Sequence, residues 1–252
     1  MNYGLYLSAT GVMANAHRQD VIANNLANSE TVGFKRDVTS FQERLTEAQA
    51  QRGPTNALLE NIGGGLLVHP TAIDFTQGEL ETTGNNLDIA VFGQGYFAVR
   101  NGNATHLTRD GRFSIDRDGL LTLENDSSQH VLDGQMRPIQ LDGRLRGAIN
   151  VGQYGEITQA GQSAGQIGLF EPANATQLTK RGGGLITGFD EKSLRPATGQ
   201  MRSEFVERSN VDPTTELAQL MDAQRQLEAN ANMIRYQDAT LGRLVNDVGK
   251  MT

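Results

Sequence analysis

The chain has 252 residues, of which 37% are hydrophobic, with no Trp, no Cys and a formal net charge of −7. The acidic balance excludes a basic field for nucleic acid or anionic lipid, and the absence of Cys excludes disulfides and thiolate metal sites. No segment approaches the run of about 18 apolar residues that spans a membrane. The first residues lack the basic region and continuous apolar core of a Sec-type signal peptide.

The N-terminal segment, residues 3–28, predicts an amphipathic helix, because its apolar and small positions recur at alternating steps of four and three residues. Asn24, Asn25 and Asn28, followed by Gly33, favour a helix end near residue 28. Phe34 is then expected to anchor the exit of the chain against an apolar surface. The stripe consists of Leu5, Ala9, Val12, Ala16, Gln19, Ala23 and Leu26.

The next segment, residues 31–77, is predicted to be an extended arm or linker. Phe41 and Leu45, four residues apart, indicate another helical turn or two within residues 38–50. Beyond them the segment is Gly-rich and irregular, and it includes three consecutive glycines at positions 63–65.

The middle of the chain, residues 78–209, reads as many short strands separated by turns. Residues 87–91, 96–99, 113–115, 120–123, 166–170 and 185–189 are the strand candidates. Asn101-Gly102 and Asp118-Gly119 are hairpin dipeptides, and Asp142-Gly143 and Tyr154-Gly155 punctuate two further short runs. This spacing predicts an antiparallel sandwich or a barrel-like β domain.

The C-terminal segment, residues 213–249, predicts a longer helix, with Asp212 as N-cap and Pro213 as its first residue. Its stripe steps by three and four residues, as in a coiled coil. Such stripes also form the buried face of an ordinary globular helix, which is the alternative interpretation. The stripe consists of Leu217, Leu220, Gln224, Leu227, Ala231, Ile234, Asp238, Leu241, Val245 and Val248.

The expected fold class is therefore α+β. Residues 1–30 and 210–252 are predicted to form one discontinuous helical coiled-coil domain, and residues 78–209 an antiparallel β-rich domain inserted between its halves. Helical stripes at both ends indicate a protein that is held by its neighbours.

Catalytic and ligand-binding signals are weak. Gly161-Gln162-Ser163-Ala164-Gly165 fits the G-x-S-x-G pattern of a hydrolase, but that motif needs a following helix and residues 166–170 read as a strand. Asp116 and Asp118 resemble the start of a calcium loop, although Gly119 comes too early and favours a hairpin turn. The four His residues have no metal-ligand spacing. No catalytic residue, metal or cofactor is expected.

Several motifs together resemble bacterial flagellar axial proteins, the rod and hook family. ANNLANSETVGFKR at residues 23–36 is similar to the N-terminal signature of that family. GELETTGNNLDIAVFGQGYFAV at 78–99, TRDGRF at 108–113, SNVD at 209–212 and ELAQLMDAQRQLEAN at 216–230 extend the resemblance to the C-terminal helix.

The resemblance implies a structural subunit that polymerises helically through its terminal helices into the tube of the flagellar rod. Copies of itself, other rod proteins and the flagellar type III export apparatus are the implied partners. The implied location is the periplasmic rod of the basal body, reached without a cleaved signal peptide. Total length favours a proximal-rod subunit, with a distal-rod subunit as the alternative. The predicted assembly interface consists of Leu5, Val12, Ala16, Ala23, Leu26, Phe34, Leu217, Leu220, Leu227, Ile234, Leu241 and Val245.

A function from another class stays open at this point. A secreted β-rich enzyme or carbohydrate-binding protein with helical oligomerisation ends would also combine hairpins with terminal helices. A closed homo-oligomer, such as a trimer, is an intermediate interpretation.

Overall fold

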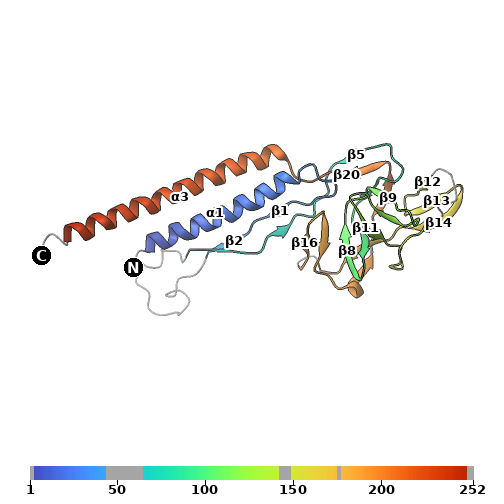
Figure 1. Ribbon diagram of the computed structural model, residues 1–252, viewed down its shortest axis with the longest axis horizontal. Coiled ribbons are helices and arrows are strands. Elements are labelled where there is room, and N and C mark those ends of the chain that lie inside the picture. The colour runs from blue at the N-terminus through green and yellow to red at the C-terminus, as the bar shows by residue number, and fades with distance from the viewer. Residues whose placement is uncertain (1–2, 44–64, 142–148, 175–176, 249–252) are drawn as a thin grey trace. The chain divides into compact units, whose positions relative to one another are not determined.

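The computed structural model describes residues 3–43, 65–141, 149–174 and 177–248 (Figure 1). The chain folds into two compact units, each assembled from segments that are distant in the sequence. Unit 1 comprises Met1–Ala27, Asp37–Ala72 and Asp212–Thr252, and unit 2 comprises Asn28–Arg36 and Ile73–Val211. The segment expected as one arm, residues 31–77, is divided between them, and the predicted domain limits stay predictions.

Unit 1 is built on two helices, α1 (Tyr3–Ala27) and α3 (Pro213–Val248), which contact each other. Both predicted helices are confirmed. The start of α3 has the expected cap: the backbone N–H of Thr214 and the hydroxyl of Thr215 donate to the carboxylate of Asp212, at 3.1 and 2.5 Å. These hydrogen bonds, that of the Thr215 side chain foremost, lower the pKa of Asp212. None of the described helices is long and apolar enough to cross a membrane.

The described part of the arm consists of strands. β1 (Asp37–Val38) pairs with β4 (Ala72–Ile73), and β2 (Phe41–Glu43) pairs antiparallel with β3 (Leu66–Val68). The predicted helical turns are therefore wrong for residues 38–43, and residues 44–50 lie outside the described part of the chain. The β-branched and aromatic side chains of Val38, Thr39 and Phe41 favour strand, and a partner strand is present. β1 and β3 both contact α1.

Unit 2 is an antiparallel β domain, as predicted. Its main sheet has nine strands, in the order β16-β17-β8-β7-β11-β10-β9, with β15 pairing with β7 and β18. β12, β13 and β14 form a separate sheet, β19 pairs with β6, and β20 pairs with β5. The strands are β5 (Leu80–Thr82), β6 (Ile89–Phe92), β7 (Tyr96–Asn101), β8 (Ala104–Thr108), β9 (Phe113–Ile115), β10 (Leu121–Leu123), β11 (Asp126–Val131), β12 (Ile149–Val151), β13 (Glu156–Gln159), β14 (Gln162–Gln166), β15 (Leu169–Pro172), β16 (Thr179–Arg181), β17 (Leu185–Thr187), β18 (Leu194–Pro196), β19 (Gln200–Ser203) and β20 (Phe205–Glu207).

The core of unit 2 lies on both faces of β7. Phe97 and Val99 belong to one cluster of buried side chains, and Tyr96 and Ala98 belong to a second. Successive side chains of a strand point to opposite faces, so both sides of this strand are covered. Residues 96–99 therefore lie at the centre of the domain, which explains why they are a continuous apolar run.

The predicted turns have the expected chemistry where they are described. Gly102 and Gly119 adopt φ angles of 58° and 80°, which favour glycine. The N–H of Gly119 donates to the carbonyl of Asp116 at 2.9 Å, so the Asp116–Gly119 segment is a hairpin turn and not a calcium loop. Asp142-Gly143 lies outside the described residues.

Candidate functional site: an assembly surface and a buried motif cluster

The contact between α1 and α3 has a definite antiparallel register. A Cβ atom added at Gly4 would lie 2.7 Å from Nε2 of Gln237, and one added at Gly11 would lie 2.9 Å from Nδ2 of Asn230. A step of seven residues on α1 thus matches a step of seven in the opposite direction on α3. The two glycines leave room for two long polar side chains of the facing helix.

The covered positions of α3 follow the same repeat. Eight buried or partly buried side chains step by four and three residues. Large apolar residues alternate in this series with polar or small ones, and Glu216 and Ala223 are almost fully buried. The series is Glu216, Leu220, Ala223, Leu227, Asn230, Ile234, Gln237 and Leu241.

The predicted stripe of α3 lies partly toward α1. Its partly buried members are Leu220, Leu227, Ala231, Ile234 and Leu241, whereas Leu217, Gln224 and Asp238 are exposed in the single copy. Positions 216, 223, 230 and 237 are also covered, because Gly4 and Gly11 leave space for polar side chains of α3. The stripe as an interface with neighbouring copies stays a prediction.

The stripe of α1 is less distinct, because this helix contacts both α3 and the arm strands. The predicted positions Leu5, Val12, Ala16 and Leu26 are partly buried, and Ala23 is exposed. The most buried side chains are others, namely Ser8, Ala14, Ile22 and Asn25.

Asn25, from the motif ANNLAN, joins α1 to the arm. Its Nδ2 donates to the carbonyl of Asp37, and the N–H of Asp37 donates to its Oδ1, both at 2.9 Å. The Asn25 side chain is 1% exposed, so this pair of hydrogen bonds satisfies a polar group that burial would otherwise destabilise.

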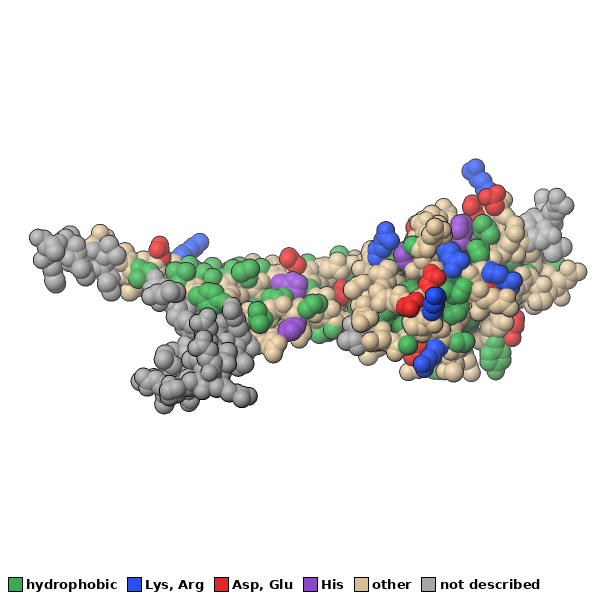
Figure 2. Space-filling model, turned by 90° about the horizontal axis from the view of Figure 1, so that it is seen from below, with side chains coloured by type: hydrophobic (Ala, Val, Ile, Leu, Met, Phe, Trp, Pro, Cys, Tyr) green, Lys and Arg blue, Asp and Glu red, His purple; other side chains and the backbone are tan. Residues whose placement is uncertain are grey.

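Unit 1 exposes an extensive apolar surface. Ten of the thirteen large hydrophobic side chains exposed among the described residues belong to it. Figure 2 shows hydrophobic side chains gathered along its helices. We call this set the apolar surface of unit 1: Tyr6, Met13, Val38, Leu66, Leu67, Val68, Leu217, Met221, Met233 and Tyr236. Single exposed apolar side chains are ordinary on a protein surface, so it is their concentration in one unit that favours an interaction site there.

Of the residues predicted for assembly, Leu217 belongs to this apolar surface, and the partly buried ones pack within unit 1. Val245 lies on α3, and its side chain is outside what the structure describes. Phe34 is different, since it is 5% exposed and lies in unit 2.

The motifs of unit 2 converge on a buried ionic group, the Glu207 cluster, formed by Lys35, Arg109 and Glu207. Oε1 of Glu207 lies 2.5 Å from Nζ of Lys35, and Oε2 lies 3.0 Å from Nη1 of Arg109. All three side chains are at most 5% exposed. Burial lowers the pKa of Lys35, and the charge of Glu207 opposes that shift.

Backbone groups complete the Glu207 cluster. The N–H of Gly78 donates to Glu207 Oε1 at 3.0 Å, and Lys35 donates to the carbonyl of Thr76 at 2.8 Å. Arg109 also donates to the carbonyl of Gly93, at 2.7 Å. The cluster thus joins the GFKR, GQGYF and TRDGRF motifs to a carboxylate that lies far along the chain.

Gly33 and Phe34 are fixed beside this cluster. Gly33 has a φ of 69°, and a Cβ atom there would lie 2.4 Å from the backbone carbonyl carbon of Arg109. Nζ of Lys180 lies 3.9 Å from the centroid of the Phe34 ring. The same Nζ also donates to the carbonyl of Lys35. Phe34 is therefore buried at the chain exit beside a cation, and its predicted part in the assembly interface stays a prediction.

Asn210, from the motif SNVD, closes the same region. Its Oδ1 accepts from the N–H of Arg36 at 2.7 Å, and its Nδ2 donates to the carbonyls of Asp74 and Thr76 at 3.0 and 3.1 Å. Arg36 and Asn210, which lie near the two ends of unit 2, are thereby joined to the segment that precedes the first strands of the β domain. Neither Glu207 nor Asn210 was predicted as a site residue, although SNVD was part of the resemblance. The signal in the sequence that could have indicated the buried carboxylate is a charged residue, Glu207, next to the apolar residues of the strand FVE.

The weak catalytic motif is placed in a strand. Ser163 lies in β14, an exposed strand of the β13–β14 hairpin, and lacks the strand–turn–helix setting of a hydrolase nucleophile. Within the described residues no group of three or more His, Asp or Glu side chains is arranged to hold a metal ion.

Known proteins are similar to this chain over most of its length. Family models of the flagellar basal body rod protein, the flagellar hook protein FlgE/F/G D1 domain and the flagellar basal body rod FlgEFG protein C-terminal region match residues 5–35, 90–159 and 202–247. A flagellar basal-body rod protein FlgF of Caulobacter vibrioides is 32% identical over 93% of both chains. The chain belongs to the flagellar basal-body rod protein family.

Other rod proteins are similar to the same extent. FlgG of Bacillus subtilis is 32% identical over 96% of this chain and 97% of its own, and FlgF of Mesorhizobium japonicum is 31% identical over 99% of both. This rod protein is thus a structural subunit of the flagellar basal body that assembles with itself and with other rod proteins. The resemblance drawn from the motifs is confirmed.

Proposed function

We propose that this rod protein polymerises helically through unit 1, with α1 and α3 packed as a coiled coil and the apolar surface of unit 1 covered by neighbouring copies. The observation that carries the proposal is the concentration of exposed hydrophobic side chains in unit 1, ten of thirteen. Copies that contact one another through two different surfaces form an open helical polymer.

The interface of the proposal is revised from the predicted stripe. The partly buried residues Leu220, Leu227, Ile234 and Leu241 hold α3 against α1, and the outward residues Leu217, Met221, Met233 and Tyr236 contact neighbours. The seam of α3 supports a coiled coil, because its polar members at 216, 230 and 237 can specify register.

The proposal includes the route and place of assembly that the resemblance implies. The chain is exported unfolded through the flagellar type III apparatus, without a cleaved signal peptide, and joins the periplasmic rod. A chain without Cys needs no oxidative step on this route, which agrees with the proposal. The role is structural and not enzymatic.

The test is a pair of substitutions, Met233→Asp and Tyr236→Asp, at side chains that are 52% and 73% exposed. Each places a charge where a neighbour is proposed to lie, and neither removes a buried contact from unit 1. Cells carrying both should be non-motile and contain no complete rods in isolated basal bodies, while circular dichroism of the purified chain shows an unchanged helix content.

Asn232→Asp is the matched control, since it adds a charge to the same helix at an exposed polar position without removing an apolar side chain. It should assemble. Complete rods built from the Met233→Asp, Tyr236→Asp chain would exclude this surface from the interface.

A further inference from the structure

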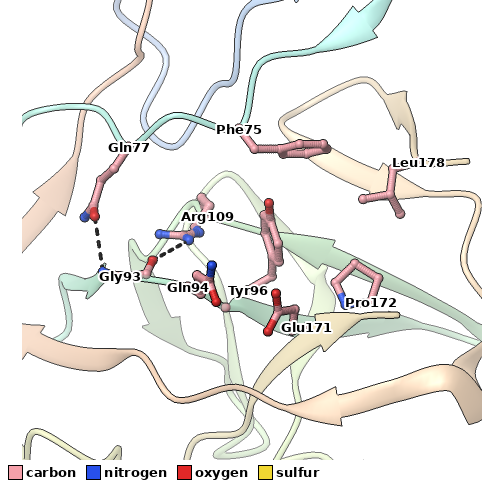
Figure 3. Close-up of a pocket in the computed structure, with 10 residues that line it drawn as sticks. Phe75, Gln77, Gly93, Gln94, Tyr96, Arg109, Glu171, Pro172 and Leu178 are labelled. Atoms are coloured by element: carbon pink, nitrogen blue, oxygen red, sulfur yellow. Dashed lines mark hydrogen bonds between the residues drawn. The ribbon is translucent and has the colours of Figure 1, made fainter. Parts of the chain in front are cut away.

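Unit 2 contains a pocket of about 340 Å³ that the core does not fill (Figure 3). Its apolar wall is formed by Phe75, Pro172 and Leu178, and its polar side by Gln94 and Glu171. Tyr96 and Arg109 also line it. All the lining residues belong to unit 2.

Contacts around its wall hold the pocket in shape. The rings of Phe75 and Tyr96 meet edge to face at 6.1 Å, and the guanidinium of Arg109 lies 5.0 Å from the centroid of the Tyr96 ring. The guanidinium donates to the carbonyl of Gly93, whose own N–H donates to Gln77. Figure 3 shows these two hydrogen bonds at one side of the pocket. A site formed in advance loses little entropy when it binds.

Glu171 gives the pocket an available acceptor. Its carboxylate is partly buried and makes no hydrogen bond or ion pair with another described residue. A partly buried acceptor is better stabilised when a donor reaches it. The pocket therefore suits a side chain with a large apolar body and a hydroxyl or N–H at its tip, a description that fits tyrosine.

Tyr154 is such a side chain on the surface of the same unit. It is 57% exposed in the turn between β12 and β13. The turn is fixed to the core, because Met201 N–H donates to the carbonyl of Gln153 at 2.9 Å and Ile167 N–H to that of Gly155 at 2.8 Å. The carbonyl of Tyr154 accepts from Gln166 at 3.0 Å. An exposed aromatic residue on a rigid turn is a typical interface anchor.

We propose that Tyr154 of one copy inserts into the pocket of unit 2 in a second copy, where its ring packs on Phe75 and Leu178 and its hydroxyl donates to Glu171. The proposal rests on the assembly role proposed above and adds a second contact to it. The occupant is a second copy because this rod protein assembles with itself. Phe92, the other exposed aromatic residue in the described part of unit 2, has no hydroxyl or N–H that could donate to Glu171, so Tyr154 fits the pocket better.

The two features occupy different parts of unit 2, since none of the residues that line the pocket lies in β12, in β13 or in the turn between them. A contact between two different surfaces is heterologous, and each further copy can repeat it.

The first experiment uses the absence of native Cys. Gln94→Cys places a thiol at the exposed rim of the pocket, and Gln153→Cys places one beside Tyr154, which stays unchanged. Oxidation of isolated rods built from the doubly substituted chain should give a ladder of disulfide-linked copies. The control combines Gln94→Cys with Asn103→Cys, at the exposed turn between β7 and β8, and should give no ladder. No ladder from the first chain, or equal ladders from both, would overturn the proposal.

The second experiment measures self-association of the purified full chain by sedimentation. Truncation of an interface anchor typically weakens association on the order of 30-fold, so Tyr154→Ala should do this while Tyr154→Phe loses less. Ile115→Ala, at another exposed apolar residue of unit 2, should change nothing. Thermal unfolding should be the same for all three, since these side chains are exposed.

The two proposals can fail separately. The pocket contact is overturned if Tyr154→Ala associates like the wild type while the Met233→Asp, Tyr236→Asp chain loses its rods, and the assembly role of unit 1 then stays in place. The assembly role of unit 1 is overturned if Tyr154→Ala loses association while the Met233→Asp, Tyr236→Asp chain still assembles, and the pocket contact then stays in place.

Discussion

Replacement of the buried carboxylate in Glu207→Gln should destabilise unit 2 strongly. The side chain is 0% exposed and faces Lys35 at 2.5 Å and Arg109 at 3.0 Å, so a neutral amide leaves two buried cations without a counter-charge. Breaking a buried ion pair by removing one partner costs about 3–5 kcal/mol. For a domain of this size each kcal/mol corresponds to about 2–4 °C, so the melting temperature should fall by about 6–20 °C.

The assay is thermal unfolding of the full chain, followed by the β-sheet signal in circular dichroism. The matched control is Glu81→Gln, because Glu81 faces Arg208 at 3.5 Å with both side chains more than half exposed. That change should stay within about 0.5 kcal/mol. Lys35→Met should cost less than Glu207→Gln, since it leaves the balanced pair of Arg109 and Glu207. Equal effects of Glu207→Gln and Glu81→Gln would refute the reasoning.

Three further predictions concern other sites. Gly33→Ala should lower the urea stability of unit 2 by at least about 2 kcal/mol, because of its φ of 69° and the adjacent backbone of Arg109, and a neutral result would contradict this. Burial raises the pKa of Tyr96 to about 12, so an absorbance titration should show a late ionisation step that the Tyr96→Phe chain lacks. The contribution of the neutral Tyr96 to the free energy of unfolding should be lost as pH rises from about 10 to about 12. Gly11→Leu should displace Asn230 and weaken the helix pair, and Asn230→Ala should restore part of the lost helix signal; additive effects would contradict the register.

Sequence patterns predicted the elements of this rod protein better than their contacts. The cap formed by Asp212 and Pro213 located the start of α3 because capping is local chemistry. The dipeptides Asn101-Gly102 and Asp118-Gly119 located two turns for the same reason. Residues 38–43 were predicted to be helical, because the local pattern does not show that Phe41 in β2 pairs with the distant strand β3.

The seam of α3 shows what a pattern within one helix leaves open. Leu217, Gln224 and Asp238 of the predicted stripe are exposed in the single copy, whereas the neighbouring positions 216, 223, 230 and 237 are covered by unit 1. Only the facing helix decides between the two flanks, through the space left at Gly4 and Gly11. A pattern within one helix cannot report the shape of another.

The Glu207 cluster could not be derived from spacing. Lys35 and Glu207 are 172 positions apart, and nothing local marks them as partners. The resemblance had already singled out the segments that meet there, since GFKR, GQGYF and TRDGRF each contribute to the cluster. What those motifs share is therefore structural: they hold the two ends of unit 2 together.

Assembly through unit 1 is tested most directly by the reactivity of a thiol placed in the apolar surface of unit 1. Tyr236→Cys introduces one into a chain that has none, at a position that is 73% exposed in the single copy. A maleimide should label it readily in the purified chain, and only after denaturation in isolated rods. Equal labelling in intact rods and in the purified chain would contradict assembly through unit 1, because the surface proposed to contact neighbours would then be open in the assembled rod.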